Sequence, residues 1–275
     1  MLNLKAIQES LRAADFLVDF STTTNTVDKK LAANLKESMY IWESVYGEIN
    51  SSANKAVETN QVNSCSNPVV TSSITGNGID VGILSSNASF VASYAHLLCN
   101  LSEGYNLIDY LELSTADKID SNADKDSKQE QKSVSKLSEA LKVVDTYEQN
   151  GGLSTPYTGS DEVRQAKERV LSLLGHVYSG KLQAVTAEGL YRSVSTEKFL
   201  VPDIGGSDGG LLNGYGPQEM YNIALTLYRY GNLLKKWEKR ETNGATLTTR
   251  ARELWGVAVH KGAHKGAHLN HFIRS

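Results

Sequence analysis

The placement of proline limits the fold of this 275-residue chain more than any other feature. The four prolines each lie in or beside a segment rich in Gly, Ser or Asn: Pro68, Pro156, Pro202 and Pro217. A proline inside a helix costs about 3 kcal/mol, because it removes a backbone hydrogen bond and clashes with the preceding turn. Since no proline interrupts a periodic segment, we predict a mainly α-helical protein with a few short β-strands.

Two apolar stripes predict helices within the first 50 residues. The stripe of residues 3–20 consists of Leu4, Ile7, Leu11, Ala14 and Val18, and that of residues 26–49 consists of Val27, Leu31, Leu35, Met39, Trp42, Val45 and Ile49. Residues 21–25 between them are rich in Ser and Thr, which favour helix N-termini. We expect residues 1–50 to form a helical pair or an arm exchanged with a neighbouring copy.

The next 80 residues change character twice. Residues 51–80 are rich in Ser, Asn and Thr and predict a long polar loop, with a short strand at 68–75. Residues 87–101 are apolar on most sides, which predicts a buried helix, so that 51–115 form a loop plus a buried helix. Acidic residues and lysines crowd residues 109–130, and we interpret 116–130 as an acidic linker.

The remaining residues, 131–275, are predicted to form a helical C-terminal region with a basic end. Apolar periodicity indicates helices over 134–144 and 160–177, and Pro217 stands at the expected first position of another. The pair Asn243-Gly244 is predicted to end that helix. Residues 245–249 and 255–259 are rich in Thr and Val and predict short strands. The whole chain fits one or two compact domains.

Composition and charge limit the classes of partner and the cellular location that we expect for this protein. A hydrophobic fraction of 40% with 21% charged residues is that of a globular protein. The net charge of −3 implies no bulk attraction to nucleic acid or membranes, so such a partner requires a local patch. No apolar run reaches the roughly 18 residues of a membrane span, and the N-terminus lacks the order of a signal peptide. We expect no membrane partner and a location in the cytoplasm or in an assembled particle, where Cys65 and Cys99 remain reduced.

Charge asymmetry marks the C-terminal region as a candidate nucleic-acid interface. Residues 228–275 hold ten Lys or Arg against three Glu. Five of these cations fall in a short segment: Arg229, Lys235, Lys236, Lys239 and Arg240. Tyr228, Tyr230 and Trp237 are interleaved with them, and basic groups beside aromatic rings suit a phosphate backbone and unstacked bases. The alternative is that the rings face the core and the cations face water. A third possibility is contact with the acidic stretch of another copy.

The C-terminal tail holds a second candidate site. Three histidines four residues apart, His260, His264 and His268, would share one side of a helix and offer imidazoles to a divalent transition metal. Gly262 and Gly266 weaken that helix, so a flexible tail is the competing interpretation.

Signatures of catalysis are sparse. The glycine-rich run 205–216 precedes a helix N-terminus but lacks the endings of a nucleotide-binding loop. His96 and Cys99 share a face of an apolar helix, where a packed histidine and a buried thiol are the expected state.

Taken together, these features favour a self-assembling structural protein over an enzyme. We predict a homo-oligomeric coat, capsid or nucleocapsid-type subunit of a virion that contacts nucleic acid through its basic C-terminal region. The alternative is a metal-dependent or nucleotide-using enzyme built on the histidine tail or the glycine-rich loop.

Overall fold

The computed structural model describes residues 29–63, 88–115, 123–152, 160–194, 215–237 and 239–262. Within these ranges every regular element is helical and there is no strand. The chain divides into two compact units, residues 1–167 (unit 1) and 168–275 (unit 2). The mainly α-helical prediction is confirmed, and the four-part division into 1–50, 51–115, 116–130 and 131–275 stays a prediction.

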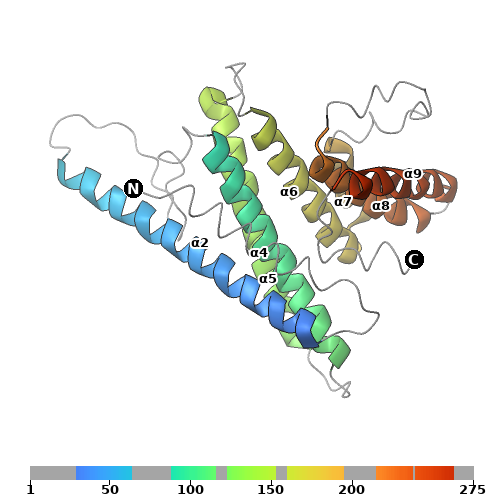
Figure 1. The fold of residues 1–275 in the computed structure, drawn as a ribbon, viewed down its shortest axis with the longest axis horizontal. Coiled ribbons are helices and arrows are strands. Elements are labelled where there is room, and N and C mark those ends of the chain that lie inside the picture. The colour runs from blue at the N-terminus through green and yellow to red at the C-terminus, as the bar shows by residue number, and fades with distance from the viewer. Residues whose placement is uncertain are drawn as a thin grey trace. The chain divides into compact units, whose positions relative to one another are not determined.

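Unit 1 is built on three long helices, α2 (Lys29–Asn63), α4 (Ala88–Thr115) and α5 (Ala123–Tyr147). Figure 1 shows α4 and α5 running side by side, with α2 packed across α4. A π-helical turn, Glu148–Gly152, ends α5, and α6 (Ser160–Gly180) begins in unit 1 and continues into unit 2.

The predicted stripe of the second helix is the face of α2 that packs in the core. Its members at 35, 39, 42, 45 and 49 are all buried. Helix α4 is buried on most sides, as predicted, because its own apolar residues occupy most of its circumference. Gly104 lets α2 approach closely, since a Cβ there would lie 2.0 Å from the sulfur of Met39.

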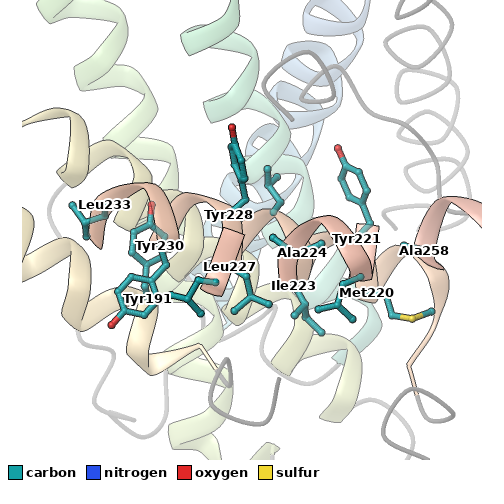
Figure 2. Close-up of a cluster of buried hydrophobic side chains, with 14 of the residues drawn as sticks. Tyr191, Met220, Tyr221, Ile223, Ala224, Leu227, Tyr228, Tyr230, Leu233 and Ala258 are labelled. Carbon is teal, nitrogen blue, oxygen red and sulfur yellow. The ribbon is translucent and has the colours of Figure 1, made fainter. Parts of the chain in front are cut away.

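Unit 2 contains the second part of α6, α7 (Ala184–Ser193), α8 (Pro217–Lys235) and α9 (Glu241–His260). Pro217 begins α8 as predicted, and Gly216 is its N-cap. Helices α8 and α9 form an antiparallel hairpin whose backbones touch at Gly231 and Gly244. A Cβ on Gly244 would lie 2.6 Å from the Gly231 carbonyl oxygen. Figure 2 shows the core of this unit along α8, with Tyr221 and Tyr228 leaving the helix on one side and Ile223 and Leu227 on the other.

Two sequence predictions for the C-terminal region are wrong. Residues 245–249 and 255–259 are not strands but belong to α9. Asn243-Gly244 does not end a helix, because Gly244 lies in the first turns of α9 and serves the close contact with α8. The reason is tertiary packing: a stripe at helical spacing is buried against α8, and this burial outweighs the β propensity of the threonines and valines. The stripe consists of Leu247, Ala251, Leu254 and Ala258.

Helices also extend into two segments that were predicted to lack them. Helix α2 continues to Asn63, inside the expected polar loop, and α5 begins at Ala123, inside the expected acidic linker. The predicted helix at 3–20 and the predicted strand at 68–75 lie outside the described residues. Among the helices that the structure describes, none is both long enough and apolar enough to span a membrane.

Candidate nucleic-acid interface

The five predicted basic residues lie at the end of α8 and in the turn that leads to α9. Lys236 caps α8: its backbone N–H donates to the Leu233 carbonyl oxygen at 3.2 Å, and the N–H of Trp237 donates to the Leu234 carbonyl oxygen at 3.0 Å. Lys239 has a φ of 68°, in the left-handed region, and this reverses the chain. The turn closes when the N–H of Arg240 donates to the Trp237 carbonyl oxygen at 3.1 Å. Backbone hydrogen bonds therefore fix the direction in which the turn presents its side chains.

Arg240 is held by a carboxylate from another helix. Its guanidinium donates to Oε1 of Glu188, on α7, at 2.6 Å, and the Tyr230 hydroxyl donates to the same oxygen at 3.0 Å. The guanidinium also lies 5.5 Å from the centre of the Trp237 ring. With side-chain exposures of 33% for Arg240 and 13% for Glu188, this ion pair is partly shielded from water. We call Glu188, Tyr230 and Arg240 the turn clamp.

The other four predicted cations divide into two groups. Lys235, Lys236 and Lys239 are exposed. Arg229 is half-buried near Tyr191, whose pKa is raised by burial while the positive charge of Arg229 opposes the shift. The structure thus leaves three of the predicted residues extended into solvent around one turn.

One further cation, Arg192, lies one helical turn after Glu188 on α7. Burial and the hydrogen bond to Glu188 raise the pKa of Tyr230, and the positive charges of Arg240 and Arg192 oppose that shift. Arg192 is exposed in the last turn of α7. Neither Arg192 nor Glu188 has a local signal in the sequence, because only the packing of α7 on α8 brings them to the turn.

The interleaved aromatic residues serve the core. Tyr228 and Tyr230 are buried, and the ring of Tyr230 stacks on that of Tyr191 with 5.5 Å between centres. Figure 2 shows this pair at one end of the buried cluster. Trp237 is partly buried against the same cluster, and Arg240 lies over its ring. Tyr228 and Tyr230 therefore do not offer open ring faces to bases.

Of the predicted metal ligands, only His260 is described. It is exposed in the last turn of α9, and His264 and His268 lie outside the described residues. Within the described ranges there is no group of three or more His, Cys, Asp or Glu side chains that would hold a metal ion. The glycine-rich run before Gly216 also lies largely outside them. Cys99 is buried and His96 is half-buried, in agreement with the packed state predicted for them.

Unit 1 has a polar cluster of its own between α2, α4 and α5. Glu139 accepts hydrogen bonds from the hydroxyls of Tyr94 at 2.7 Å and Tyr46 at 3.1 Å, and it pairs with Lys136 at 3.2 Å. The Lys136 ammonium lies 3.5 Å from the centre of the Tyr46 ring. These four side chains satisfy one another, which indicates a structural role in joining the three helices.

Tyr105, which lies on α4 as Tyr94 does, also has a carboxylate as hydrogen-bond acceptor and a lysine beside its ring. Its hydroxyl donates to Oε1 of Glu43, on α2, at 3.0 Å, and Lys132, on α5, lies 5.3 Å from its ring centre. Burial, together with a neighbouring carboxylate that accepts the phenolic hydrogen, raises the pKa of Tyr94 and of Tyr105 above the ordinary tyrosine value.

The chain was also compared with known proteins. It matches no protein-family model, no curated protein and no solved structure.

Proposed function

We propose that this chain is a self-assembling structural protein of the coat or nucleocapsid type, which contacts nucleic acid through its basic C-terminal region. The observation that carries the assembly part is an apolar surface at the α6–α7 turn. Leu182 is 91% exposed and Val185 is 79% exposed, whereas the apolar residues of the neighbouring helices are mostly buried. Contiguous exposed apolar surface is typical of protein–protein contacts, and we place such a surface around these two side chains.

The backbone supports this interpretation of the α6–α7 turn. Leu182 has a φ of 59°, a left-handed conformation that costs a side chain with a Cβ about 1 kcal/mol and that glycine adopts without strain. Val185 follows three residues later, in the first turn of α7, and is exposed as well. A leucine that is strained and exposed at once is accounted for if another copy of the chain covers it.

The nucleic-acid part is supported by the basic turn. Three lysines extend into solvent from a turn that backbone hydrogen bonds and the turn clamp hold in place. The bulk charge of the chain is slightly negative, so this local surface is where a polyanion is expected to bind.

Size-exclusion chromatography with light scattering tests the assembly part. We expect particles far larger than the 30.0 kDa monomer, and we expect the double variant Leu182→Gly with Val185→Ser to release monomers. The variant should fold, because glycine relieves the strained backbone. Gly189→Ala is the matched control on α7: the position is exposed and a Cβ there meets no atom within 4 Å.

A monomer at all concentrations would overturn the proposal. Particles that persist in the double variant, with unchanged circular dichroism, would show that the α6–α7 turn is not the contact.

A further inference from the structure

We infer that the basic turn binds the phosphate backbone of nucleic acid through Lys235, Lys236, Lys239 and Arg192, and that Arg240 is a positioning residue. This inference rests on the nucleic-acid contact proposed above and assigns its residues. It distinguishes the exposed cations, which a ligand can reach, from Arg240, which is already bonded to Glu188.

Arg240 already has a structural role, because its side chain is bonded within the protein. Its guanidinium is bonded to Glu188 at 2.6 Å and lies over the Trp237 ring, so a phosphate would have to compete with a carboxylate already in place. Breaking this ion pair would also remove one of the contacts that tie the turn to α7. Arg240 therefore acts on binding through the position of the turn.

The lysines need a different explanation. Lysine near the C-terminus of a helix interacts favourably with the helix dipole, and this accounts for Lys235 and Lys236 without any ligand. It does not account for Lys239, which lies beyond the end of α8 in a left-handed conformation. It also does not account for Arg192, which lies on another helix, one helical turn after the Glu188 that holds Arg240. Cations that converge from separate segments are expected where a polyanion binds.

The buried aromatic residues decide which part of a nucleic acid is contacted. Because Tyr228 and Tyr230 are in the core and Arg240 lies over Trp237, these rings cannot serve as stacking platforms for bases. Without such platforms the exposed cations are left to contact phosphates, and contacts to phosphates carry no sequence information directly. We therefore expect binding that is independent of sequence, equal for single strands of different composition, and strongly dependent on salt.

Fluorescence anisotropy with labelled oligonucleotides of mixed sequence and of a single repeated base tests the inference. The full-length double variant Lys236→Gln with Lys239→Gln should bind roughly tenfold or more weakly at low salt, for every sequence alike. The slope of log K against log salt should become shallower by about 1.4 for single strands, since two phosphate contacts are lost. The matched control is Lys36→Gln with Lys142→Gln, which removes two exposed lysines of unit 1 and should bind as the unaltered chain does.

The variant Glu188→Gln tests whether Arg240 positions the turn or contacts the phosphate itself. It removes the charge that holds Arg240 but no cation, so we expect weaker binding with an unchanged salt slope. A salt slope that steepens in Glu188→Gln would show that the freed Arg240 binds phosphate itself and would overturn its assignment.

Three further results would overturn the inference. One is an equal loss in the Lys36/Lys142 control, and another is a binding preference for one base. The third is binding to vesicles containing phosphatidylserine, or to acidic segments of other copies, without binding to oligonucleotides. Light scattering of the Lys236/Lys239 variant keeps the two proposals apart, because particles that form without nucleic acid leave the assembly proposal intact.

Discussion

Two glycines set the distance between α8 and α9. A Cβ on Gly244 would meet the Gly231 carbonyl oxygen at 2.6 Å and the Lys235 backbone nitrogen at 2.7 Å, and backbone atoms have little freedom to move aside. We expect Gly244→Ala to lower the free energy of unfolding by about 1–3 kcal/mol, because overpacking forces the two helices apart. Urea unfolding followed by circular dichroism measures the loss.

Gly256 provides a control on the same helix. It is exposed and a Cβ there meets no atom within 4 Å, so Gly256→Ala should gain about 0.5–1 kcal/mol from helix propensity alone. If Gly244→Ala were as well tolerated as Gly256→Ala, the close approach of α8 and α9 would be wrong.

Single residues also show where sequence reasoning reaches its limit at the basic turn. Lys235, Lys236 and Lys239 were selected from local charge density, and they are exposed as a binding role requires. Glu188 and Arg192 lie more than 40 residues before the turn and carry no local signal. They become neighbours of Arg240 only through the packing of α7 on α8, which includes the Tyr191–Tyr230 stack.

Among the helices, those with a clear apolar stripe were predictable and those with mixed signals were not. The stripe of α2 stands out because its members are large and regularly spaced, and the same holds for α8 after Pro217. The stripe of α9 contains two alanines and is surrounded by β-branched residues. The helical spacing was therefore weak in the sequence, and the β-branched residues predicted strands instead. Packing against α8 makes this segment helical, because the side chains of Leu247 and Leu254 are buried there. A local stretch of sequence does not contain that information.

Helix α4 is joined to its neighbours by tyrosines that must stay protonated. Burial and the carboxylates of Glu139 and Glu43 raise the pKa of Tyr94 and Tyr105 above the ordinary value of 10.0. A pKa raised in the folded state gives stability that is complete below the unfolded pKa and is lost as pH rises toward the folded pKa. We therefore expect unit 1 to lose stability above about pH 10 and to unfold before these phenols ionise.

An alkaline titration checks this expectation, with phenolate absorbance and circular dichroism recorded together. A late, cooperative rise in absorbance should coincide with the loss of helix. Tyr94→Phe should be less stable at neutral pH by about 1.5–3 kcal/mol, through loss of a hydrogen bond to a charged group, and should depend less on pH above about 10. Tyr40→Phe is the control, since Tyr40 is 74% exposed. A smooth titration of all tyrosines in a folded protein would contradict the prediction.

For the whole molecule, the division into two units implies that damage to one core need not reach the other. The core cluster of unit 2 consists of residues from 187 to 258. Trp42 is buried in unit 1, whereas Trp237 and Trp255 belong to unit 2. Replacing Trp237 and Trp255 by Phe would therefore leave Trp42 as a fluorescence probe of unit 1 alone, since the chain has three tryptophans.

In that background we expect Gly244→Ala to split the unfolding curve. Part of the helical circular dichroism should be lost at lower urea concentration, while the Trp42 transition stays where it is without the substitution. Among the helices that the structure describes, α6 argues against separation, because its residues 160–180 run through the boundary at 167 and a continuous helix transmits unfolding along its length. A Trp42 transition that moves together with the dichroism would show that α6 couples the two cores into one cooperative structure, and an unmoved transition would show that each core folds by its own contacts.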